Sequence, residues 1–196
     1  MKRIDALGSL PAPAKDRDIQ TTVLPFYDQK TVRLVRVKST SWNQPAVAFY
    51  YLDADKNLYH LNGTSPPIHE VNHRSTIALT QENVLDYLRF FCFFVRTGDD
   101  PFLIAEGLSQ SEIPEGLTDQ ERAALTKVLR PALYCGYLES GKDFYAMATM
   151  YYMNSVSICD FKIHVSGTIE MIGEVEDVIK NLSAKVNEPI RLLLPV

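Results

Sequence analysis

The sequence predicts an α+β fold: a curved antiparallel sheet wrapped around one long apolar helix at residues 80–96, with two shorter helices. One observation behind this is the run TQENVLDYLRFFCFFVR, which is apolar on most of its circumference at helical spacing. Another is a series of strand-like runs after residue 130, joined by tight turns. The hydrophobic content of 46% in 196 residues is ordinary for a globular protein.

The central helix is expected to begin at Thr80, whose hydroxyl can cap the first turn, and to end before Gly98. Its polar stripe includes Asp86 and Arg89, whose spacing lets the two side chains meet. A membrane span is excluded because the uncharged run Phe90–Val95 is far shorter than the roughly 20 residues that a bilayer requires. We therefore expect the helix to be covered by the rest of the fold.

Before this helix, residues 1–25 are rich in proline, alanine and charge, and are expected to form an extended N-terminal arm. Residues 26–196 show no internal linker and are expected to form a single α+β domain. Within it, residues 31–39 have strand composition, and residues 46–52 and 58–61 form a hairpin.

The DADKN sequence between these two strands starts like a calcium loop, at Asp53, Asp55 and Asn57. Such a loop needs glycine at its sixth position and glutamate at its twelfth, where this chain has Leu58 and Thr64. A simple turn is therefore predicted.

After the central helix, residues 101–107 are expected to form a short buried strand, and Thr118 with Glu121 forms a capping box for a helix that ends before Pro131. Four further strands are expected to form an antiparallel meander, with Ala146 and Ala148 facing the helix. The run at residues 174–186 has acids first and lysines later, which predicts a third helix. The four strand runs span residues 132–139, 143–153, 156–165 and 168–172.

Composition narrows the classes of function. The net charge of −4 gives no basic balance, so nucleic acid is not an expected partner. The three cysteines are odd in number and lack C-x-x-C spacing, which predicts free thiols in a reducing compartment. No apolar segment opens the chain, so neither a secretion signal nor a membrane anchor is expected, and a cytoplasmic location is predicted.

The motif H-E-x-x-H occurs at His69-Glu70-Val71-Asn72-His73. On a helix the two histidines could ligate zinc, with the glutamate as general base. Pro66 and Pro67 lie directly upstream, so residues 68–72 are expected to be extended or irregular. A third ligand has no better candidate than Glu106, and we expect no stoichiometric zinc, no metal site and no cofactor.

The residues do not decide whether the protein is an enzyme. The first hypothesis is a non-catalytic domain that binds a partner chain or a small apolar ligand, in its simplest form a homodimer through a sheet face. The alternative is a hydrolase of thioester-like substrates bound along the central helix; a zinc metallohydrolase using the histidine motif is the less favoured alternative. Candidate ligand or partner residues are Asp86, Arg89, Tyr151, Tyr152 and Asp160.

Overall fold

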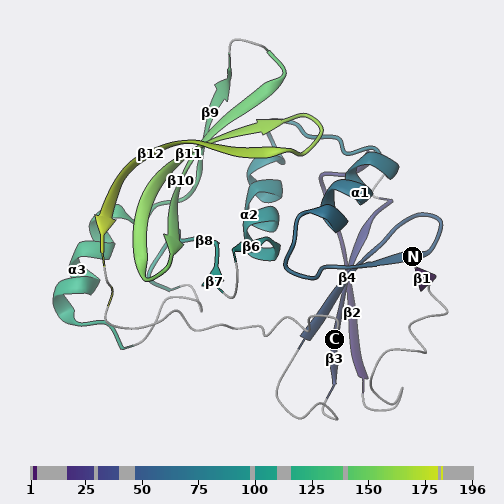
Figure 1. Ribbon diagram of the computed structural model, residues 1–196, viewed down its shortest axis with the longest axis horizontal. Coiled ribbons are helices and arrows are strands. Elements are labelled where there is room, and N and C mark those ends of the chain that lie inside the picture. The colour runs from purple at the N-terminus through teal and green to yellow at the C-terminus, as the bar shows by residue number, and fades with distance from the viewer. Residues whose placement is uncertain are drawn as a thin grey trace. The chain divides into compact units, whose positions relative to one another are not determined.

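The computed structural model confirms the α+β class, with antiparallel sheets and three helices among the described residues. The chain divides into two compact units (Figure 1): unit 1 comprises Met1–Ala78 with Ile190–Val196, and unit 2 comprises Leu79–Pro189. No helix of the described part is long and apolar enough to cross a membrane. The structure describes residues 2–3, 17–28, 31–39, 47–97, 100–109, 116–138, 141–180 and 182.

Unit 1 contains a five-stranded antiparallel sheet in the order β1-β5-β4-β3-β2. Its first and last strands come from the predicted N-terminal arm, and the predicted hairpin is confirmed as β4 and β5. One face buries a small cluster of Val35, Val37, Ala48 and Leu58. The strands are β1 (Lys2–Arg3), β2 (Arg17–Val23), β3 (Arg33–Ser39), β4 (Val47–Leu52) and β5 (Asn57–His60).

The turn prediction for DADKN is confirmed. The Asp53 carboxylate is buried and accepts hydrogen bonds from the Asn57 backbone N at 2.7 Å, from Asn57 Nδ2 at 2.8 Å and from the Tyr59 hydroxyl at 3.1 Å. Lys56 takes a φ of 63°, which closes the turn. These oxygens thus stabilise the hairpin between β4 and β5.

The prediction of an extended or irregular segment at residues 68–72 is wrong, because Pro66–Arg74 forms helix α1. Proline is tolerated in the first helical turn, where its missing N–H has no partner to lose and its fixed φ suits a helix. Ile68 and Val71 are fully buried, and Asn72 Oδ1 accepts a hydrogen bond from the Tyr27 hydroxyl at 2.6 Å. Packing of this face holds the short helix in unit 1.

Unit 2 is built on a second antiparallel sheet in the order β12-β11-β10-β8, with β9 also paired to β10. The predicted meander is confirmed for its four runs, and Met153 and Asn154 both take positive φ in the tight turn between β10 and β11. The strands are β8 (Leu103–Ile104), β9 (Leu133–Tyr137), β10 (Asp143–Tyr152), β11 (Ser155–His164) and β12 (Ile169–Ile179); β6 (Arg96–Thr97) and β7 (Asp100–Pro101) form a small separate pair.

The central apolar helix, α2 (Val84–Phe94), is shorter than the predicted 80–96. Thr80 instead forms a turn with Asn83, whose side chain accepts a hydrogen bond from the Thr80 backbone N at 2.8 Å. The helix lies on the face of the sheet that carries Ala146 and Ala148, both almost completely buried. Cys92 of α2 is close enough to interact electrostatically with Cys159, which pairs directly with Ala148. A sheet that wraps around this helix is not confirmed.

Helix α3 (Asp119–Val128) confirms the predicted capping box of Thr118 and Glu121. It packs on the opposite face of the sheet, where Leu125 joins a buried cluster with Tyr151 and Val156. The Thr149 hydroxyl fixes its end by donating to the Val128 carbonyl at 3.0 Å. The second face of the sheet is therefore covered at the β8 end by α3.

The predicted third helix at residues 174–186 is wrong where the structure describes it, because strand β12 continues to Ile179. This strand pairs with β11 through three shifts of register, so pairing outweighs the helical charge pattern. Val175, Val178 and Ile179 are β-branched residues that favour strands.

We predict that replacing Leu88 with alanine destabilises the protein by about 2–5 kcal/mol, because this side chain of α2 is 0% exposed and its loss leaves a cavity. Ile172→Ala is the matched control: Ile172 is 47% exposed and lies outside β9, so the free energy of unfolding should change by less than about 0.5 kcal/mol. Chemical denaturation of both variants measures the difference. Equal losses would contradict the packing of α2.

Candidate functional site

The predicted pair Asp86 and Arg89 forms a salt bridge of 3.0 Å on α2, as the spacing indicated. Arg89 is also held by Glu106, with Nε to Oε2 at 2.9 Å and Nη2 to Oε1 at 2.8 Å. Glu106 accepts a third hydrogen bond from the backbone N of Ala132 at 2.8 Å. The hydrogen bonds from Arg89 lower the pKa of Glu106. This network ties α2 to the chain before β9, which is a structural role.

The two tyrosines at the end of β10 point to opposite faces, as predicted from their adjacency. Tyr151 is buried in the α3 cluster, and its hydroxyl donates to Asn154 at 2.8 Å. Tyr152 is half-buried, and its ring lies 4.7 Å from that of Phe102. Neither tyrosine is more than half exposed, so they do not form an open aromatic surface.

Asp160 lies half-buried on β11, opposite Met147 of β10 and Gly173 of β12. Its carboxylate accepts a hydrogen bond from the Tyr145 hydroxyl, which raises the pKa of Tyr145. A Cβ at Gly173 would meet Asp160 Oδ2 at 3.3 Å, so glycine leaves the room that this carboxylate occupies. Asp160 therefore lies on the face of the sheet opposite α2, near β9.

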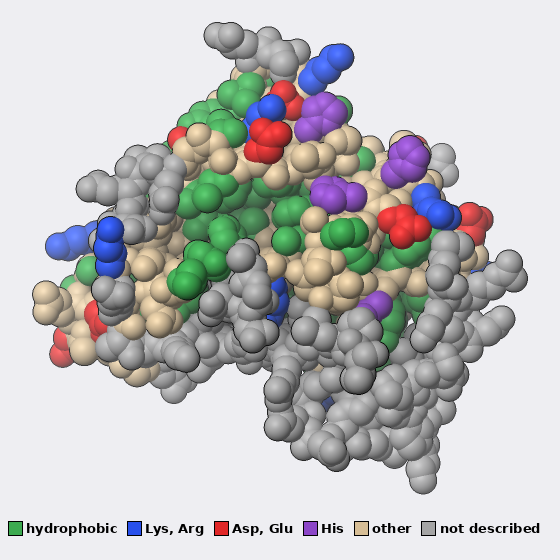
Figure 2. All heavy atoms as spheres, in the orientation of Figure 1, with side chains coloured by type: hydrophobic (Ala, Val, Ile, Leu, Met, Phe, Trp, Pro, Cys, Tyr) green, Lys and Arg blue, Asp and Glu red, His purple; other side chains and the backbone are tan. Residues whose placement is uncertain are grey.

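Strand β9 carries two strongly exposed apolar side chains, and among the described residues β12 carries two others, Met171 at 50% and Ile172 at 47% exposed. Leu133 is 55% exposed and Tyr137 is 54% exposed, and Cys135 between them is also exposed. Figure 2 shows apolar side chains gathered over the β9 end of the sheet. Among the described residues, β9 pairs with β10 on one side and with no strand on the other. The bulge puts Leu133 on the face of Met147 and Tyr137 on the face of Phe144, so the two side chains flank this edge on opposite faces; we call Leu133, Cys135 and Tyr137, with the unpaired edge, the β9 surface.

The edge strands β2 and β12 carry charge, whereas the two-residue edge strand β8 is uncharged but has buried side chains. Strand β2 of unit 1 includes Arg17 and Asp18, and its exposed apolar residues Ile19 and Val23 are 43% and 38% exposed. Strand β12 contains three glutamates and one aspartate and is broken by shifts of register. Charge and bulges are the usual protection of an edge against unwanted pairing. The sequence LYCGY of β9 has no charge, although a single bulge places Cys135 outside the pairing with β10.

Sequence reasoning missed the β9 surface, although a signal was present. The strand is uncharged and contains two large apolar residues at its ends, which is unusual for an edge. The local sequence pattern does not indicate that β9 is an edge strand. Its position at an edge arises only in the folded sheet, where β8 and β9 both pair with the same side of β10.

All three cysteines are free thiols in the structure. Burial is the main cause that raises the pKa of Cys92 to about 12, and the neighbouring Cys159 adds to it. The pKa of Cys135 is raised by partial desolvation and then by the charge of Asp160. None of these causes favours a thiolate, so neither Cys92 nor Cys135 has the environment of a nucleophile.

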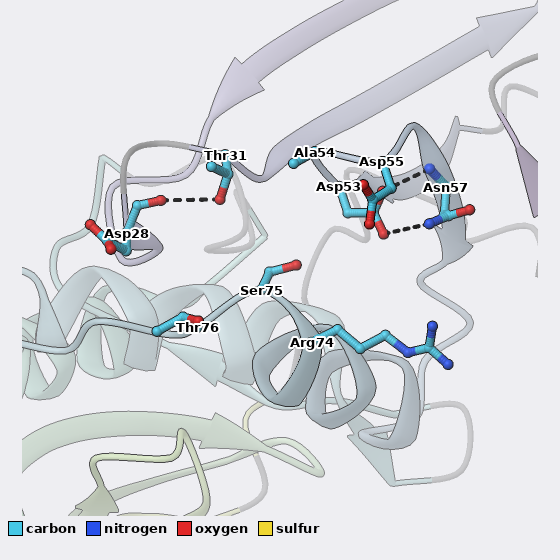
Figure 3. Close-up of a pocket in the computed structure, with 9 residues that line it drawn as sticks. All are labelled: Asp28, Thr31, Asp53, Ala54, Asp55, Asn57, Arg74, Ser75 and Thr76. Atoms are coloured by element: carbon cyan, nitrogen blue, oxygen red, sulfur yellow. Dashed lines mark hydrogen bonds between the residues drawn. The ribbon is translucent and has the colours of Figure 1, made fainter.

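Unit 1 contains an open polar pocket of about 450 Å³ beside the turn at Asp53 (Figure 3). Asp28 and Thr31 lie on one side of it, Asp55 and Asn57 lie on the other, and the Arg74 guanidinium points away from Asp28. The lining offers hydroxyls, an amide and carboxylates, so it suits a polar molecule better than the predicted apolar ligand.

Helix α1 places the histidine motif on a helical backbone. His69 is half-buried, and burial lowers its pKa, whereas His73 is exposed. Glu70 forms a salt bridge with Arg74 at 3.2 Å. No group of three or more His, Cys, Asp or Glu side chains in the described part is arranged to hold a metal ion, and the proposed third ligand Glu106 binds Arg89 in unit 2. The ligand set of a catalytic zinc site is therefore not found there.

Comparison with known protein families, with curated proteins and with solved structures gives no match for this chain.

We predict that Glu106→Gln destabilises the protein by about 1–3 kcal/mol near neutral pH, because it removes a charge-assisted pair with Arg89. The pKa of Glu106 is lowered from its ordinary value of 4.5, so its contribution is present above that value and is lost as pH falls through the folded pKa. Urea denaturation near neutral pH and at about pH 3 tests this, since the two proteins should converge at the acidic pH. A difference that persists unchanged at low pH would contradict it.

We predict that one thiol per chain, Cys135, reacts with a thiol reagent in the native protein, because Cys92 and Cys159 are buried. All three thiols should react after denaturation. Mass spectrometry of alkylated peptides identifies the labelled residue. Rapid labelling of Cys92 in the native protein would show that α2 does not cover this part of the sheet as described.

Proposed function

We propose that this chain is a non-catalytic partner-binding protein, and that its partner is a second copy of the same chain that meets it along β9. The observation that supports the proposal is an uncharged edge strand with two apolar side chains more than half exposed, Leu133 and Tyr137. Burying one such side chain fully is worth roughly 1.5–3 kcal/mol, and the free backbone groups of the edge can pair with a second strand.

The aromatic part of the β9 surface packs against neighbouring rings of unit 2. The ring of Tyr137 lies 5.0 Å from that of Phe144 and 6.1 Å from that of Tyr134. Side chains that are already ordered lose little conformational entropy on association. Such rings are also among the side chains enriched at interfaces between proteins.

Charge favours a second copy as the occupant. When the β9 strands of two copies pair antiparallel, no like charges face each other, because the sequence LYCGY is neutral. In the sequence Arg130 precedes β9 and Glu139 follows it, so two-fold antiparallel pairing brings the basic end of one strand toward the acidic end of the other. Self-pairing through β12 would instead oppose several acidic residues.

The other hypotheses receive less support. A hydrolase that uses Asp86 and Arg89 needs a free polar stripe, whereas Arg89 is engaged by both Asp86 and Glu106. The polar lining of the pocket in unit 1 does not favour a small apolar ligand. The hydrolase and the cytoplasmic location remain predictions from the sequence.

The self-association is tested by analytical ultracentrifugation over a range of concentrations up to about 100 μM. We expect a dimer for the natural sequence and a monomer for Leu133→Lys, since the lysine places like charges at the interface. Because Leu133 is exposed in the single chain, the variant should still fold, which its circular dichroism spectrum checks. Alkylation of Cys135 should also be slower in the dimer than in the variant.

The matched control is Ile19→Lys, which introduces the same charge at an exposed position of the β2 edge in unit 1 and should leave the dimer intact. A strict monomer at every concentration would refute the proposal. Equal loss of the dimer in both lysine variants would place the interface elsewhere.

A further inference from the structure

We propose that His69 and His73 of α1 form a two-histidine chelating site for a borderline divalent transition-metal ion such as Zn²⁺. The site is distinct from the β9 surface, because it lies in unit 1, and it does not depend on the proposed function. It uses the H-E-x-x-H motif, which has no role in the proposed partner binding.

The geometry of α1 carries this inference. Residues four apart on a helix are about 40° apart around its axis and one turn apart along it, so their side chains are neighbours. The buried face is formed by Ile68, Val71 and Asn72, which places His69 beside that face and His73 next to His69 toward solvent. An ion held by both imidazoles would therefore lie at the surface of unit 1, with solvent on its open side.

The half-burial of His69 suits this role. Packing around a half-buried ring restricts its rotamers, so less entropy is lost when a metal ion fixes it. A ligating imidazole uses one ring nitrogen, and its other nitrogen can keep a hydrogen bond to the protein. Exposed His73 can then turn toward the ion that His69 positions.

The neighbouring charges leave the pair accessible. Glu70 and Arg74 form their own i,i+4 salt bridge at 3.2 Å, along the adjacent row of the helix. This pairing offsets the positive charge of Arg74 next to His73 and also engages the glutamate that a metalloprotease would use as general base. The site therefore binds a metal ion without the machinery for metal-assisted hydrolysis.

The ligand type defines the chemical class of the ion. Imidazole nitrogen prefers Zn²⁺, Ni²⁺ and Cu²⁺, whereas Mg²⁺ and Ca²⁺ prefer oxygen ligands. With two protein ligands, water completes the coordination, and binding is weaker than in a closed four-ligand site. An ion that joins His69 to His73 also links two successive turns of α1 and stabilises this helix when bound.

Isothermal titration of the full chain with Zn²⁺ tests the proposal. We expect one Zn²⁺ per chain for the natural sequence and at least about tenfold weaker binding for His73→Ala, with His69→Gln as a second variant. Zn²⁺ should raise the melting temperature of the natural protein and not that of His73→Ala. His73 is exposed, so its variant is expected to fold normally.

Three controls distinguish this site from other groups of the protein that could bind Zn²⁺. His164→Asn removes a histidine of unit 2 and should leave Zn²⁺ binding unchanged, as should Cys135→Ser, which removes the exposed thiol. Mg²⁺ should not compete, because competition would place the ion among the aspartates of the polar pocket. The absence of Zn²⁺ binding, unchanged affinity in His73→Ala, or loss of binding in Cys135→Ser would each overturn the proposal.

Discussion

Unit 2 depends on the hydrogen-bonded pairing of β10. This ten-residue strand pairs along its whole length with β11, while its other side is divided between β9 and β8. Its side chains alternate between the face that receives α2 and the face that receives α3 at one end. Because two short strands share one side of β10, β9 ends as an edge, and the β9 surface follows from that division.

The sequence predicted the elements whose signals are local. The capping box at Thr118, the turn at Asp53 and the strands of the meander depend on side chains a few residues apart, and all were found. The errors at residues 68–72 and 174–186 arose where tertiary structure outweighs local preference. In α1 a buried face holds a helix that begins with two prolines, and in β12 pairing with β11 overrides the pattern of charges.

The candidate sites were predictable only in part. The contact between Asp86 and Arg89 followed from their spacing, but Glu106 is 17 residues from Arg89 and was nominated for a different role. The exposure of Leu133 and Tyr137 depends on the order of strands, which hydrophobic alternation within a single strand does not encode. Long-range pairing therefore set the limit of inference from the sequence.

The contact between Asp160 and Gly173 couples two positions that lie on adjacent strands. Any side chain at residue 173 must share space with a carboxylate whose oxygen would lie 3.3 Å from the new Cβ. Alanine at residue 173 becomes easier to accept once residue 160 is shortened, for instance to serine, whereas alanine beside an intact aspartate requires the carboxylate to move by a few tenths of an ångström. Substitutions at these two positions are therefore coupled, and a side chain at residue 173 fits best beside a shorter residue at 160.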